Sequence, residues 1–92
     1  MGRVADSIER KLREALQPSR LEVIDESGLH VGHVGARPGG ETHFRVEVTA
    51  ACFVGQPRLA RQRRVYQVLA AELAGPVHAL SVRALAPGEA EA

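Results

Sequence analysis

The sequence ESGLHVGHVGARPGGETHF, residues 26–44, connects two stretches that have the hydrophobic pattern of β-strands. It contains five of the nine glycines and three of the four histidines of the chain. Glycine and proline at this density exclude a helix and weaken a strand, so we predict a long loop. Compact domains rarely contain so long a connection without a use for it. The first candidate functional residues are therefore the three loop histidines: His30, His33 and His43.

The stretches on either side of this loop predict a pair of strands. Phe44, Val46 and Val48 alternate with polar residues, which is typical of a half-buried strand. Residues 21–25 predict a shorter strand before the loop. We expect the two strands to pair antiparallel because one loop connects them.

The remaining elements follow from helical and alternating spacings. Residues 4–16 predict an amphipathic helix that Pro18 ends. Residues 58–74 predict a second helix, closed by Gly75 and Pro76. Its apolar residues are expected on the packed side and its arginines on the other side, with Gln62 near the packed face. The apolar set comprises Leu59, Val65, Tyr66, Leu69 and Leu73, and the polar set comprises Arg61, Arg64 and Gln67.

Residues 77–85 predict a third strand, in which His78 opens the strand on its core-facing side. The order helix, strand, strand, helix, strand predicts an α/β (α+β) fold. It has a small mixed three-stranded sheet, with both helices packed on one face. The 92 residues form one domain, with an ordered core over about residues 4–86. The small, acidic segment 87–92 predicts a disordered tail.

Composition narrows the class of protein. A formal net charge of +1 does not by itself indicate a nucleic-acid binder. The single cysteine, Cys52, excludes an intramolecular disulfide and favours a reducing compartment. The N-terminus lacks the apolar region of a signal peptide, and no stretch is long enough to cross a bilayer. We therefore expect a soluble cytoplasmic protein that is a monomer in isolation.

Four blocks of sequence, in order along residues 4–86, resemble the BolA family. They are LEVIDESGLH (21–30), PGGETHFRVEV (38–48), FVGQPRLARQRRVYQVLAAEL (53–73) and PVHALSVRALAP (76–87). The resemblance implies a fold similar to class II KH domains, with the order α-β-β-α-β. It also implies a monothiol glutaredoxin partner and a [2Fe–2S] cluster bridged between the two proteins. The function implied is iron–sulfur cluster assembly, trafficking or iron regulation. Glutaredoxin cysteine and glutathione thiolates would complete the ligands, and the isolated apo chain is expected to carry no cluster.

The resemblance also implies which histidines are ligands. His78, in the Val-His-Ala-Leu block, matches the family's near-invariant ligand, and His30 matches the second ligand by its position in the loop. His33 is an additional nearby candidate, whereas His43 matches a family position that is not usually a ligand. The family usually has Arg-His-Arg in the second helix, where this chain has Gln62 between two arginines. This departure affects a role in DNA contact or partner docking rather than cluster binding.

Taken without the resemblance, the same residues allow other interpretations. His78 alone is typical of a strand-end histidine that hydrogen-bonds at the rim of the core. A zinc site from His30, His33 and His78 is conceivable, although a His-x-x-His spacing is a weak signal. Cys52 fits a small packed residue better than a reactive thiol.

Arginines in the second helix support an alternative function as a small DNA-binding transcriptional regulator. The cluster consists of Arg58, Arg61, Arg63 and Arg64. The Gly-x-x-Gly loop of KH domains is absent between Phe53 and Arg58. No paired carboxylates, P-loop or nucleophile elbow indicate an enzyme. Asp25, Glu26 and Glu41 flank the loop, where we expect them to shape its ends or steer a partner.

Overall fold

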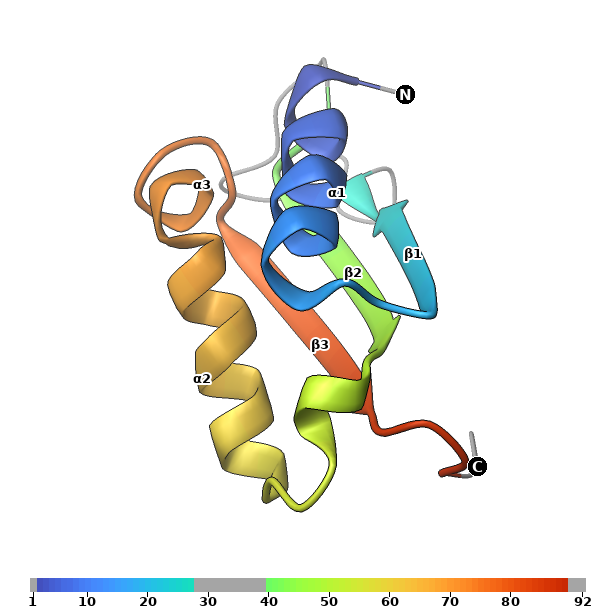
Figure 1. Ribbon diagram of the computed structural model, residues 1–92. Coiled ribbons are helices and arrows are strands. Elements are labelled where there is room, and N and C mark those ends of the chain that lie inside the picture. Colours follow the sequence, from blue (N-terminus) through green and yellow to red (C-terminus); the bar gives the residue numbers. More distant parts are fainter. Residues whose placement is uncertain (1, 28–39, 90–92) are drawn as a thin grey trace.

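A computed structural model describes residues 2–27 and 40–89 of the chain. Figure 1 shows two long helices on one face of a three-stranded sheet. The elements are α1 (Arg3–Leu16), β1 (Arg20–Asp25), β2 (His43–Thr49), the 3-10 helix η2 (Ala51–Phe53), α2 (Arg58–Val68), α3 (Ala70–Ala74) and β3 (Ala79–Leu85). The predicted order and fold class are confirmed, with the second predicted helix divided in two.

The sheet has the order β1-β2-β3 and is mixed. β1 and β2 are antiparallel, as predicted, with Val23 opposite Val46. β2 and β3 are parallel, with Val46 opposite Val82, because the chain crosses over through α2 and α3. The parallel pairing brings His43, which begins β2, beside Ala79, which begins β3. Both strands therefore present their first residues at one edge of the fold.

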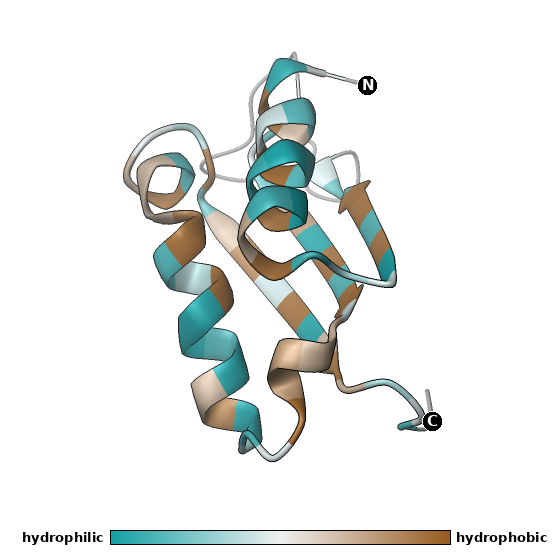
Figure 2. Cartoon of the chain, in the orientation of Figure 1, coloured by the Kyte–Doolittle hydropathy of each residue, from teal (hydrophilic) through white to brown (hydrophobic). Residues whose placement is uncertain are grey.

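The core lies between the helices and the sheet. Phe44, Val46 and Val48 of β2 are buried, whereas the residues between them are half-buried or exposed. Figure 2 shows this alternation as hydrophobic and hydrophilic bands along the strands. α1 contributes Ala5, Ile8, Leu12 and Leu16 to this core. Phe53 of η2, which follows β2 in the chain, is also fully buried. Cys52 is half-buried against this core, as the packed-residue interpretation expects.

The ends of α1 are defined by two local features. Gln17 adopts a left-handed conformation (φ 48°), and its N–H donates to the Arg13 carbonyl, so the helix ends before Pro18. At the N-terminus, the Glu41 carboxylate accepts N–H groups of Val4 and Ala5 at 2.9 and 3.1 Å. These N–H groups have no partner within the helix, and an anion here is favoured by the helix dipole. Glu41 thus shapes a loop end, as expected.

The predicted packed face of the second helix is confirmed in part: Leu69 is buried, but two of its apolar residues are exposed. α2 buries Val65, whereas Leu59 and Tyr66 are 57% and 40% exposed. The helix is interrupted at Leu69 (φ −101°, ψ 20°), so one periodicity calculated over 58–74 combines two segments of different direction. Arg61, four residues before Val65, lies on the packed side, contrary to its expected place in solvent.

A buried carboxylate joins α3 to α1. Glu72 accepts a hydrogen bond from the Ser7 hydroxyl at 2.7 Å and pairs with the Lys11 ammonium at 2.8 Å. Burial acts to raise the pKa of Glu72, but the Lys11 and Ser7 contacts outweigh it, so this pKa lies below its ordinary value. The charged form is therefore the one that links the two helices.

The segment after β3 is described as far as residue 89 and contacts the fold there. Ala86 is buried, and the Glu89 carboxylate accepts the Ala86 N–H at 2.8 Å. The Arg61 guanidinium reaches the same carboxylate with two hydrogen bonds, of 2.6 and 2.9 Å. An ion pair therefore joins the start of the predicted tail to α2. Residues 90–92 lie outside the described residues.

Candidate functional site

The candidate site lies at the edge where β2 and β3 begin. His78 directly precedes β3 and is exposed, rather than opening the strand toward the core as predicted. The reason is that the neighbouring Val77 occupies the core, at 4% exposure, so the next side chain points outward. The His78 N–H donates to the Thr42 carbonyl at 2.7 Å, and the Ala79 N–H reaches the same oxygen at 3.2 Å. An exposed imidazole is thereby held on a fixed main chain.

A second imidazole lies beside it. The rings of His43 and His78 are stacked, with centroids 6.4 Å apart and an interplanar angle of 28°. A hydrogen bond of 2.8 Å joins His43 Nδ1 to Thr42 Oγ1, which leaves Nε2 as the ring nitrogen farther from the main chain. His43 thus has contacts within the fold. Its ring also belongs to the surroundings of His78, which the sequence did not indicate.

Ser27 and Asp25 hold this edge together. The buried Ser27 hydroxyl accepts the N–H groups of Thr42 and His43 at 2.9 and 3.2 Å. The Asp25 carboxylate accepts the N–H groups of Ser27 and Glu41 at 2.9 and 3.1 Å. Burial acts to raise the pKa of Asp25, but these hydrogen bonds and the nearby His43 outweigh it, so the pKa is lowered. Asp25 therefore shapes the loop end, as expected.

The two loop histidines, His30 and His33, lie outside the described residues. The chain leaves the described part after Ser27 and returns at Gly40, and both residues lie at the edge that carries His78. The Ser27–Thr42 hydrogen bond of 2.9 Å fixes this proximity. Among residues 2–27 and 40–89, no group of three or more histidine, cysteine, aspartate or glutamate side chains could hold a metal ion.

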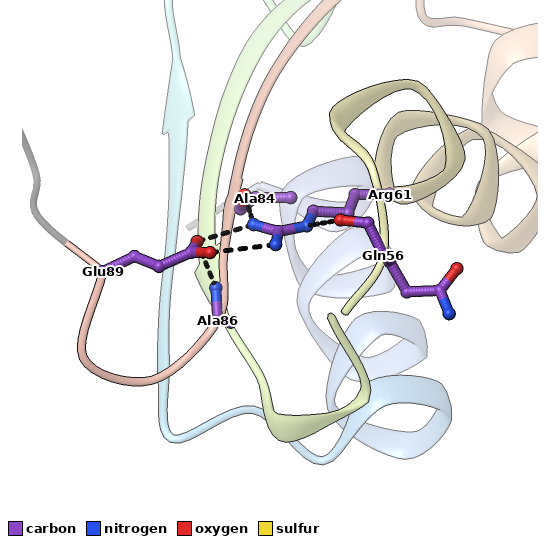
Figure 3. A network of polar contacts seen from close by, with 5 residues as sticks. All are labelled: Gln56, Arg61, Ala84, Ala86 and Glu89. Atoms are coloured by element: carbon purple, nitrogen blue, oxygen red, sulfur yellow. Dashed lines mark hydrogen bonds and ion pairs between the residues drawn. The ribbon is translucent and has the colours of Figure 1, made fainter. Parts of the chain in front are cut away.

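The four arginines of α2 do not form the single basic cluster that the sequence predicted. Arg58, Arg63 and Arg64 are exposed, whereas the Arg61 side chain is only 12% exposed. Figure 3 shows the Arg61 guanidinium between Gln56, Ala84 and Glu89, and its hydrogen bonds to the first two carbonyls are 2.8 and 3.1 Å long. Arg61 is thus occupied within the fold.

Sequence reasoning missed Ser27 and Thr42 as residues that position the site. Neither has a signal in a single sequence, because serine and threonine at a loop end are common and their partners are 15 residues apart. The exposed helix face around Leu59 was also missed.

Comparison with known proteins identifies the family. The family model for BolA-like proteins matches residues 12–89, so this chain belongs to the BolA family. The chain is 47% identical over 89 residues to human BolA-like protein 1, covering 97% of this chain and 62% of the human protein. It is 43% identical over 79 residues to the Escherichia coli protein named DNA-binding transcriptional regulator BolA, covering 86% of this chain and 71% of that protein. 

The solved structures include the BolA domain of SufE1 from Arabidopsis thaliana. It superposes with a TM-score of 0.88 at 38% identity, over 98% of this chain and 99% of that domain. The fold that the family resemblance implied is confirmed. In the described part of the chain, no helix is both long enough and apolar enough to cross a membrane.

Proposed function

We propose that this protein is a non-enzymatic cytoplasmic accessory factor that binds a monothiol glutaredoxin and shares a [2Fe–2S] cluster with it. The isolated chain is a monomer without the cluster. His78 is the main ligand from this chain, and His30 or His33 is the second. The proposed role is cluster assembly, trafficking or iron regulation.

The observation that carries this proposal is the exposed His78 ring on a fixed main chain. A ligand shared with a second protein must reach beyond its own surface, and His78 does so while its N–H remains bonded to Thr42 at 2.7 Å. The loop that carries His30 and His33 begins and ends at the same edge. Both described ends of this loop therefore lie near His78.

The residues present fit such a cluster. Imidazole nitrogen can replace thiolate on one iron of a [2Fe–2S] centre, which raises the reduction potential. In this proposal the glutaredoxin cysteine and the glutathione thiolate supply the remaining ligands. When bound, the cluster supplies one-electron chemistry and transferable iron and sulfide. This chain contributes the exposed imidazole and the rigid edge beneath it.

Anaerobic reconstitution with a monothiol glutaredoxin, glutathione, iron and sulfide tests this proposal. Visible absorption and circular dichroism should show a heterodimer spectrum distinct from that of the glutaredoxin homodimer. His78→Ala should remove that spectrum while the apo protein retains its far-ultraviolet circular dichroism, because the His78 side chain is exposed. His30→Ala and His33→Ala, measured separately, identify the second ligand.

His43→Ala is the matched control, since it removes the neighbouring imidazole but leaves the proposed ligands in place. A mixed complex whose spectrum is the same for wild type and His78→Ala would remove His78 from the ligand set. If no complex forms and the glutaredoxin keeps its own spectrum, the cluster function is wrong for this protein.

A second candidate function is DNA binding, because the Escherichia coli relative is named a DNA-binding transcriptional regulator. Three exposed arginines support it: Arg58, Arg63 and Arg64. Binding to a DNA duplex should weaken steeply with salt, and each of the substitutions Arg58→Ala and Arg64→Ala should reduce the salt slope by about one. An affinity that neither salt nor these substitutions change would exclude this function.

A further inference from the structure

One side of α2 carries a row of exposed and half-buried residues. They occur at helical spacing and continue into the first residue of α3, so they form one line along the surface. They line a shallow open groove of about 450 Å³. The residues are Leu59, Gln62, Arg63, Tyr66, Gln67 and Ala70. We call this row the α2 outer stripe.

The α2 outer stripe includes two large, exposed hydrophobic side chains, Leu59 and Tyr66. Leu59 is 57% exposed and Tyr66 is 40% exposed, although Val65 and Leu69 of the same segment are buried. Large apolar side chains that are seven residues apart on one helix are typical anchors for a packed helix.

Tyr66 is already held in place. Its hydroxyl donates to the Leu80 carbonyl of β3 at 2.8 Å, so the ring has little rotational freedom left. A ring that is fixed before binding loses less conformational entropy when it is covered. Tyrosine is also among the residue types that contribute most to binding at protein interfaces.

The charged residues of α2 around the outer stripe are all positive. Arg58, Arg63 and Arg64 are exposed, and the chain has no aspartate or glutamate between residues 48 and 71. Arg61 has its counter-ion in Glu89, but no ion pair joins the three exposed arginines to any described residue. A partner that covers the stripe would therefore gain from carboxylates at its edge.

We propose that the α2 outer stripe docks an acidic amphipathic helix of a partner protein. The apolar face of that helix covers Leu59 and Tyr66, and its carboxylates pair with Arg63 and the flanking arginines. A nucleic acid would use the arginines but would gain little from Leu59 and Ala70. The proposal is independent of the cluster, because it involves none of the histidines.

The full chain can be tested with a fluorescent 18-residue helical peptide that has leucines on one face and glutamates on the other. Fluorescence anisotropy should show binding that Leu59→Ser weakens about tenfold, because an anchor loses its apolar contact. Arg63→Ala should weaken binding about threefold at low salt and less at high salt. Amide chemical shifts should change along 59–70.

Two matched variants serve as controls. Val54→Ser removes a hydrophobic side chain that is 65% exposed but does not line the groove. Arg3→Ala removes an exposed arginine of α1. Neither should change the affinity. A peptide with the same composition but scrambled faces should bind at least tenfold more weakly.

Three results would overturn the proposal. The first is equal peptide affinity for wild type and Leu59→Ser. The second is a dimer in sedimentation analysis that Leu59→Ser dissociates, since a second copy would then cover the stripe. The third is a DNA duplex that shifts the same amides while the acidic peptide does not bind.

Discussion

The two ends of β3 carry polar clusters that are built in opposite ways. At its start, His78 presents an exposed ring, and the hydrogen bonds that hold it come from the main chain. Beyond its end, the side chains of Arg61 and Glu89 bind each other and nearby main-chain groups, and Arg61 is 12% exposed (Figure 3). The His78 imidazole is exposed, whereas the Arg61 and Glu89 side chains are bound within their own cluster. Exposure, rather than charge, separates a candidate site from a structural contact.

The difference is clearest for arginine. Four arginines lie within seven residues of α2, and sequence alone gives them one role. The fold divides them, because Arg61 shares the packed side with Val65 and lies with its guanidinium 6.0 Å from the centre of the Phe53 ring. Arg61 therefore contributes to the stability of the domain, whereas the other three arginines lie on its surface.

The largest effect is expected for Arg61→Ala. It leaves the carbonyls of Gln56 and Ala84 and the Glu89 carboxylate without the guanidinium, and it frees the segment after β3. The midpoint of thermal unfolding, followed by circular dichroism, should fall more than for any other arginine substitution in α2. Arg64→Ala is the control. Equal midpoints for both variants would contradict a structural role that is special to Arg61. A loss of glutaredoxin binding in folded Arg61→Ala protein would contradict the separation of this cluster from the candidate site.

The next effect is expected for Ser27→Ala, at the other end of β3. The N–H groups of Thr42 and His43 lose the hydroxyl that accepts them, in a buried place. The free energy of unfolding, from urea denaturation, should fall by roughly 1–3 kcal/mol. Ser81→Ala, at an exposed position of β3, should leave it nearly unchanged. Similar losses for both variants would mean that Ser27 does not hold this edge.

A smaller effect is expected for Glu41→Ala. Removal of the carboxylate that caps α1 should lower the free energy of unfolding by about 1 kcal/mol. Glu41→Gln should lose less, because its amide oxygen can still accept the N–H groups of Val4 and Ala5. The two variants can be compared by urea denaturation. Equal losses would show that charge, rather than hydrogen bonding, makes the cap effective.

The smallest effect is expected for Glu89→Gln, and it depends on pH. The hydrogen bonds from Arg61 lower the pKa of Glu89 from 4.5 to about 2. The unfolded chain therefore binds more protons than the folded chain in this window, so the contribution is present above pH 4.5 and is lost toward pH 2. The difference in unfolding midpoint between wild type and Glu89→Gln should shrink over this range. A difference that stays constant with pH would contradict the ion pair.

The local elements could be read from the sequence because their signals are local. The alternation from Phe44 to Val48 predicted β2, and the spacing of Ile8, Leu12 and Leu16 predicted α1. The exposure of Leu59 and Tyr66 could not be read, because helical spacing groups apolar residues on one side but does not show how far the neighbouring elements extend over that side. Likewise, the acidic composition of residues 87–89 gave no sign that Glu89 would meet Arg61, 28 residues away.

The sequence by itself determined the family, the order of the elements and the identity of the candidate ligand His78. Four blocks of residues carry that information, and short-range spacing carries the rest. Only the tertiary structure decided that His43 lies beside His78, that Arg61 is enclosed and that Leu59 is exposed. The physical reason is that parallel pairing and side-chain burial join residues far apart in the chain, and no local pattern encodes which of them meet.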